Sequence, residues 1–137
     1  MNRLEFQQLT QLRLDEASLL LEKGRYAGAY YLVGYAVECA FKACISKQTR
    51  EHDFPLKTSD RLYTHDLNNL LHFSGLSEEH RRNSDENAEF RLNWAIVKDW
   101  KEDARYSLLI KKDQAEALHA AVTDGKDGIL QWLQKWW

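Results

Sequence analysis

The feature that most constrains the fold is an apolar stretch from Ala27 to Ile45, in which only Glu38 and Lys42 carry a charge. A helix without a polar face belongs inside a bundle of other helices. At 1.5 Å per residue, a helix from Ala27 to Lys47 would be about 31 Å long, roughly the width of a small domain. A membrane span would also fit this length, but the two charges and the lack of a second such segment argue against it. We therefore predict a buried central helix.

Glu38 and Lys42 stand four residues apart with the acid first, the order in which the two side chains meet on one helical face. Charges this deep in an apolar helix are costly unless they are paired, so we predict an ion pair. Gly34 lies one turn before Glu38 on the same face, where another segment could approach closely. A structural pair that reaches a groove is the simpler interpretation, and contact with a ligand is the alternative.

The rest of the chain predicts more helices and no strands. A first amphipathic helix from about Asn2 to Lys23 should end at Gly24 and run antiparallel to the central helix. A loop is expected from Lys47 to Tyr63. The first helix is marked by an apolar stripe of Phe6, Leu9, Leu12, Leu14, Ala17, Leu20 and Leu21, and the loop contains Pro55. After the loop, Thr64 should be the N-cap of a short helix that stops at Gly75. Another helix should start at Ser77 and be followed by a polar break from Asn83 to Asn87.

Two further helices complete the expected bundle. One begins as early as Ala88 and is marked by Trp94, Val97, Trp100 (or Lys101) and Ala104. The last begins at a capping box of Asp113 and Glu116. Its apolar stripe recurs at intervals of three and four residues, with a kink or close contact expected at its glycines: Ala115, Leu118, Val122, Gly125, Ile129, Trp132 and Trp136. We predict a single all-α domain, residues 1–137, folded as an antiparallel up-and-down bundle of about five helices.

Composition limits the classes of function. The net charge of −2 and the pI near 6.2 offer no broad surface for a polyanion, although a local site remains compatible with them. Cys39 and Cys44 point to different sides of one helix, which indicates reduced thiols in a cytosolic protein. The N-terminal residues lack the apolar core of a signal peptide. We therefore expect a cytoplasmic protein.

The segment from Tyr26 to Ala43 resembles the second helix of HEPN domains (higher eukaryotes and prokaryotes nucleotide-binding domains). The run from Tyr63 to Leu71, with its His-Asp-Leu turn, and Trp100 followed by Arg105-Tyr106 extend the likeness over nearly the whole chain. The resemblance implies a helical bundle that is usually a homodimer. It also implies pairing with a minimal nucleotidyltransferase, as in toxin–antitoxin-like operons.

Many HEPN domains are metal-independent ribonucleases whose signature is an arginine followed after four to six residues by a histidine. This sequence departs from that pattern, because the first histidine after Arg105 is His119, and only three residues separate Arg61 from His65. The resemblance nevertheless implies a site for nucleotide or RNA in a groove near the following residues: Glu38, Lys42, His65, Arg105 and Tyr106.

Three of these residues are also candidates for catalysis. A metal-independent ribonuclease needs a base near the 2′-hydroxyl and a cation near the phosphate. His65 and Arg105 could supply them, and Tyr106 could add a hydroxyl group or a stacking face. The structural alternatives are a helix-start role for His65, bonded to neighbouring backbone, and a role for Arg105 as the buried partner of an acid such as Glu38.

Other chemistries lack their motifs. The five histidines show no metal-ligand spacing, and neither a phosphate-binding glycine loop nor a nucleophile elbow is present, so we expect no metal and no cofactor. Trp132 and Trp136 should pack in the core, whereas Trp137 could anchor a second subunit. Three functions stay open: a nucleotide- or RNA-binding partner of a nucleotidyltransferase, a ribonuclease with a non-standard active site, and a non-catalytic dimeric interaction module.

Overall fold

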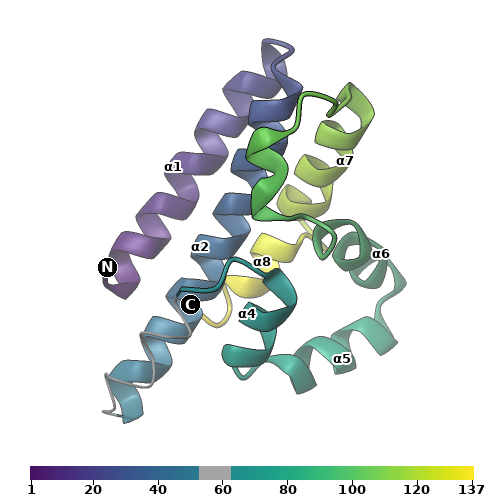
Figure 1. Ribbon diagram of the computed structural model, residues 1–137. Helices are drawn as coiled ribbons and strands as arrows, with labels where there is room; N and C mark the ends of the chain where they lie inside the picture. The colour runs from purple at the N-terminus through teal and green to yellow at the C-terminus, as the bar shows by residue number, and fades with distance from the viewer. Residues whose placement is uncertain (53–62) are drawn as a thin grey trace.

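The computed structural model describes residues 1–52 and 63–137, with side chains placed for all of these except 49–52. Within these ranges the chain is all-α and forms a helical bundle, as predicted (Figure 1). The described ranges hold seven α-helices rather than about five, together with a 3₁₀ helix, and no strand. The elements are α1 (Arg3–Glu22), α2 (Tyr26–His52), α4 (Leu67–Phe73), α5 (Ser77–Glu86), α6 (Ala88–Val97), η1 (Glu102–Tyr106), α7 (Lys112–Thr123) and α8 (Ile129–Leu133).

Helices α1 and α2 form the predicted antiparallel hairpin (Figure 1). A capping box starts α1, because the Asn2 side chain accepts the Glu5 N–H at 2.9 Å and the Glu5 carboxylate accepts the Asn2 N–H at 2.7 Å. Gly24 adopts a φ of +76°, which lets the chain turn directly into α2. The prediction that Leu12 faces the core is wrong. Leu12 is half exposed, because the buried face of α1 follows Phe6, Thr10, Leu14 and Ala17.

Helix α2 is the buried central helix that the sequence predicts. Nearly every residue from Val33 to Ser46 is buried, and α2 packs against α1, α4, η1, α7 and α8. The helix continues to His52, so the predicted loop does not begin at Lys47. The remaining part of that predicted loop, with Pro55, lies outside the described residues. No helix of the described residues combines the length and the apolar composition that a membrane span needs.

The short helix α4 begins two residues later than predicted. Asp66, not Thr64, is its N-cap, since the Asp66 carboxylate accepts the Asn69 N–H at 3.0 Å. Gly75 ends the helix with a φ of +75°, as expected. Helix α5 continues into the predicted polar break and ends at Glu86. Asn87 separates it from α6, and its side chain caps α6 by accepting the Phe90 N–H at 3.1 Å.

Helix α6 ends at Val97, so the prediction that Trp100 and Ala104 belong to it is wrong. Trp100 lies in the turn before η1 and is fully buried against α2. A Cβ atom at Gly34 would lie 2.1–2.2 Å from the nearest indole atoms, which only a glycine avoids. The close approach expected at Gly34 is therefore made by Trp100.

The predicted last helix is two helices, α7 and α8. Asp124 separates them, because its carboxylate accepts the N–H groups of Lys126 at 3.2 Å and Asp127 at 2.7 Å in a tight turn. Helix α7 also starts earlier than the predicted Asp113 cap, with the Lys111 N–H donated to Gln114 Oε1 at 2.9 Å. Trp137 is partly buried against a cluster of Phe6, Cys39 and Ala43, which corrects the prediction of an exposed anchor: Trp137 packs on its own chain.

Candidate functional site

A buried carboxylate in the middle of α2 lies at the innermost end of the site. Glu38 is 1% exposed, and its Oε1 atom accepts from Lys42 Nζ at 2.9 Å, which confirms the predicted ion pair. The same oxygen lies 2.5 Å from Nδ1 of His65, in the segment just before α4. Two donors thus meet one oxygen of a charge that would be very costly to bury alone. The other oxygen, Oε2, has no hydrogen-bond partner among the described residues.

His65 bridges two carboxylates from different parts of the chain. Its Nδ1 faces Glu38, and its Nε2 lies 3.1 Å from Oε2 of Glu102, the first residue of η1. The imidazole therefore contacts acidic side chains, in place of the neighbouring backbone that the structural alternative predicts. Each ring nitrogen thus faces one carboxylate oxygen.

Arg105 continues the chain of contacts on the outer side. Its NH1 atom lies 3.0 Å from Oε1 of Glu102, and its guanidinium group lies 4.8 Å from the centre of the Tyr106 ring. A hydrogen bond to the Tyr106 phenol is the main cause that raises the pKa of Arg105 above its usual value. Arg105 is exposed and pairs with Glu102, so the interpretation of Arg105 as a buried partner of Glu38 is wrong. Within the described part of the chain, Arg105 and Glu38 are linked through Glu102 and His65.

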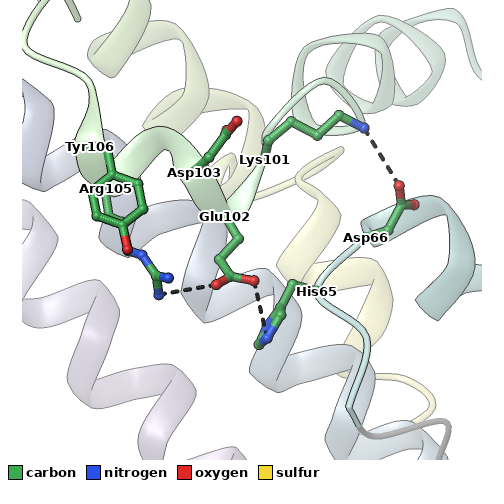
Figure 2. A pocket seen from close by; sticks show the side chains of 7 residues that line it. All are labelled: His65, Asp66, Lys101, Glu102, Asp103, Arg105 and Tyr106. Carbon is green, nitrogen blue, oxygen red and sulfur yellow. Dashed lines mark ion pairs between the residues drawn. The ribbon is translucent and has the colours of Figure 1, made fainter.

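An open cavity of about 350 Å³ beside η1 is lined by the outer part of this group and its neighbours (Figure 2): His65, Asp66, Lys101, Glu102, Asp103, Arg105 and Tyr106. Lys101 and Asp66 close one side of it with an ion pair of 3.5 Å. The backbone N–H of Asn69 and then the charge of Lys101 lower the pKa of Asp66. A second cavity of about 520 Å³ shares Lys101, Asp103 and Tyr106 with the first. We refer to these two cavities together as the η1 groove.

The structure brings the five predicted site residues into one connected group. Glu38, Lys42 and His65 form its inner half, and Arg105 with Tyr106 form its outer half. Glu102, which joins the halves, was missed by the sequence analysis, although it stands three residues before Arg105, at the spacing of a helical ion pair. Lys101 was missed as well, and nothing in its local sequence distinguishes it.

Other reactive groups lie away from this groove. Cys39 and Cys44 are free and buried, and burial raises the pKa of each thiol to about 12, so neither is an activated nucleophile. Among the residues that the structure describes, no group of three or more His, Cys, Asp or Glu side chains is arranged to hold a metal ion. Comparison of the chain with family models, with curated proteins and with solved structures finds no match.

Proposed function

We propose that the protein binds a nucleotide, or the phosphodiester backbone of RNA, in the η1 groove. The observation that carries this proposal is the position of the Glu102 carboxylate. One of its oxygens lies 3.1 Å from His65 Nε2, and the other lies 3.0 Å from Arg105 NH1. A phosphate group presents oxygens to the same kind of donor pair, and such charge-assisted bonds are among the stronger ones in proteins.

Glu102 thus occupies the place that a phosphate would take, as a built-in competitor. Its side chain is 27% exposed, so it can rotate toward solvent when an anionic ligand enters. Lys101 supplies a second cation at the rim, and the exposed ring of Tyr106 offers a face on which a base can stack. Binding is local, since the chain as a whole carries a net charge of −2.

In this proposal the protein acts as a HEPN-like partner of a minimal nucleotidyltransferase, in a toxin–antitoxin-like pair in the cytoplasm. The support for this assignment is the arrangement of residues on which the resemblance rests. The central helix supplies Glu38 and Lys42, the His-Asp-Leu turn supplies His65, and the Arg-Tyr pair forms the outer wall. These segments are far apart in the sequence. His65, Arg105 and Tyr106 line the η1 groove, whereas Glu38 and Lys42 do not line it and are joined to it through the contact of Glu38 with His65.

A binding titration with labelled ATP, GTP and a short RNA tests the proposal. Arg105→Ala should weaken binding about tenfold to a hundredfold, because a bond to a charged group is lost. Glu102→Gln should strengthen binding, because the competing charge is removed while the size of the side chain is kept.

Helix α5 offers a matched control. Arg81 and Glu78 form an ion pair of 2.7 Å with the same three-residue spacing, on an exposed surface. Arg81→Ala and Glu78→Gln should leave binding unchanged. Failure of both the wild type and Glu102→Gln to bind any of the three probes would refute the proposal, as would equal effects from the α5 variants.

A metal-independent ribonuclease is the second candidate, and the Glu38–His65 contact favours it. Glu38 holds Nδ1 of His65, which is how an orienting acid positions a catalytic base. Once Glu102 leaves, Nε2 would take the proton of a 2′-hydroxyl as that oxygen attacks phosphorus, and water would protonate the departing 5′ oxygen. Arg105 would neutralise the charge on the phosphate.

Cleavage of a mixed RNA pool in the presence of a chelator tests this second candidate. Both His65→Ala and Arg105→Ala should abolish cleavage, whereas Arg81→Ala should not. Cleavage that persists in the His65 and Arg105 variants would exclude this active site, and absence of cleavage by the wild type would leave binding as the function of the groove.

A further inference from the structure

A serine and a histidine from distant parts of the chain meet in a cavity apart from the η1 groove. Ser18 lies on α1 and His119 on α7, and Ser18 Oγ is 3.1 Å from His119 Nε2 although the two residues stand 101 positions apart. Both line a cavity of about 380 Å³ between α1, α7 and α8. This volume is sufficient for a small organic molecule. No residue of the cavity's described lining belongs to the η1 groove, so the cavity is a separate site.

The two side chains have the properties of a nucleophile and its base. A serine hydroxyl is a weak nucleophile until a neighbouring group removes its proton. Burial lowers the pKa of His119, so the ring is neutral at pH 7, and Nε2 can accept that proton when Nδ1 carries the ring hydrogen. Ser18 is exposed, so a reactant in the cavity can reach its Oγ atom. A serine held within hydrogen-bond distance of a neutral histidine is the geometry that nucleophilic catalysis requires.

Three side-chain amides share the cavity with this pair. They belong to Gln11, Gln131 and Gln134. Gln11 stands seven residues before Ser18 and therefore on the same face of α1. Its Nε2 atom donates to Asp15 Oδ1 at 2.9 Å, and the amide has a second N–H for another acceptor. Amide N–H groups are among the donors that stabilise the oxyanion formed in acyl transfer.

The remaining lining indicates which reactant fits. Leu14, Val122 and Leu130 give the cavity an apolar wall that can hold a short acyl chain. The charged side chains of the described lining are those of Asp15 and Asp124, and both are acidic. An anionic reactant is therefore repelled, whereas an uncharged one is not.

We propose that Ser18 and His119 hydrolyse uncharged carboxylic esters with a short acyl chain, through an acyl intermediate on Ser18. Ser18 Oγ attacks the carbonyl carbon of the ester while His119 Nε2 takes the hydroxyl proton, and the amides stabilise the negative charge on the carbonyl oxygen. The bond from the carbonyl carbon to the alcohol oxygen then breaks. The proton on His119 passes to that oxygen, and the alcohol leaves.

Water completes the reaction by the same route. It attacks the acyl carbon and gives one proton to His119, and the carboxylic acid is released as Ser18 Oγ takes that proton back. One ester and one water thus yield one alcohol and one acid, and both side chains return to their starting state.

Hydrolysis of p-nitrophenyl butyrate by the full chain tests the inference. Ser18→Ala and His119→Gln should each lower kcat/KM about a hundredfold or more, because the nucleophile and its base act as a unit. For the same reason, the double variant should lose no more than either single variant. Ser77→Ala and His72→Gln are matched controls that should react as the wild type does, since both residues are exposed and lie outside the cavity.

A fluorophosphonate probe identifies the nucleophile directly. Ser18 Oγ should bond to the phosphorus of the probe as fluoride leaves, and mass spectrometry of a digest should locate the label on Ser18. His119→Gln should slow this labelling about a hundredfold or more. Circular dichroism should show that Ser18→Ala keeps its helices, because this side chain is exposed.

Three results would overturn the inference. The first is a wild type that does not hydrolyse the butyrate ester. The second is a rate in Ser18→Ala or His119→Gln equal to that of the wild type, because the contact would then only join α1 to α7. The third concerns the class of reactant: the mono-p-nitrophenyl ester of succinic acid, which has a free carboxylate, should react more slowly than the butyrate, and equal rates would contradict the assignment of an uncharged ester.

Discussion

Replacing Gly34 by alanine would place a methyl group inside the ring of Trp100. The added Cβ atom would lie 2.1 Å from Cε2 and 2.2 Å from Cδ2 and Nε1 of the indole. Trp100 is fully buried, and its ring stacks on Tyr31 with the ring centres 6.1 Å apart. The indole can therefore move away only by disturbing the packing of the core, so the methyl group and the ring cannot both keep their places.

The expected change in the free energy of unfolding combines a loss from overpacking with a gain from the higher helix propensity of alanine. Overpacking a core costs about 1–3 kcal/mol, and contacts this short belong at the upper end, near 3 kcal/mol. Alanine in place of glycine gains about 1 kcal/mol in a helix. Gly34→Ala should therefore lower the free energy of unfolding by about 2 kcal/mol. For a domain of this size, 1 kcal/mol corresponds to about 3–5 °C, so the Tm should fall by about 6–10 °C.

Urea and thermal unfolding followed by circular dichroism measure this effect. Gly125→Ala is the matched control, because a Cβ atom at Gly125 meets no atom within 4 Å and should change the stability by less than about 0.5 kcal/mol. In a Trp100→Ala background the clash is removed, and Gly34→Ala should stabilise the chain by up to about 1 kcal/mol. A Gly34→Ala protein that is as stable as the wild type would refute the reasoning, as would a loss that persists without the indole.

Three further predictions concern buried groups. Glu38→Ala leaves the Lys42 ammonium without its partner and should lower the free energy of unfolding by about 3–5 kcal/mol. The double variant Glu38→Ala, Lys42→Met should lower it by less. Equal decreases for the two variants in urea unfolding would contradict this prediction. Burial lowers the pKa of His80, whose ring packs against Phe90, Trp94 and Trp132. The folded state therefore disfavours the protonated ring, so stability should fall as the pH drops below about 6.5, the pKa of histidine in an unfolded chain. Urea midpoints measured from neutral to mildly acidic pH should depend less on pH in His80→Leu than in the wild type. The same pH dependence in both proteins would contradict this prediction. Burial holds the pKa of Cys39 and Cys44 near 12, so a thiol reagent at neutral pH should label them only in denaturant, and equal labelling in the folded protein would show that they are accessible.

The sequence was most informative where the pattern allowed a single physical solution. The stretch around Glu38 and Lys42 predicts a buried helix with an internal ion pair, and the structure has both. Gly24 and Gly75 follow helices at the positions where a positive φ is needed, and both adopt it. These features depend on neighbours along the chain, which periodicity and turn chemistry describe well.

Sequence reasoning failed where contacts between distant segments decide the outcome. The spacing of Trp100 fits a continuation of α6. Its indole instead packs where Gly34 has no side chain, about 66 residues earlier in the sequence. The stripe from Ala115 to Trp136 keeps a helical period across the turn at Asp124, because α7 and α8 both present apolar faces to the same core. A regular period thus indicates which face is buried and not that the helix is continuous.

The candidate site was only partly predictable for the same reason. His65, Arg105 and Tyr106 stood out through a family resemblance, and the structure places them around one groove. Glu102 looks in the sequence like one more surface acid, and its role as the link between His65 and Arg105 exists only once η1 is placed over α2. The contact of Glu102 with His65, a residue distant in the sequence, therefore cannot be predicted from the residues around Glu102.

The central position of α2 also has a consequence for the order in which the chain can fold. Helices α1 and α2 are neighbours in sequence, so their hairpin can form as soon as both have left the ribosome, from contacts that cost little loop entropy. The opposite face of α2 is covered by α7 and α8, and Cys44 Sγ reaches the carbonyl oxygen of Leu133 at 3.7 Å. That face of the central helix therefore stays uncovered until α7 and α8 have been synthesised and have packed against it. Until then, α2 needs protection from aggregation in the nascent chain.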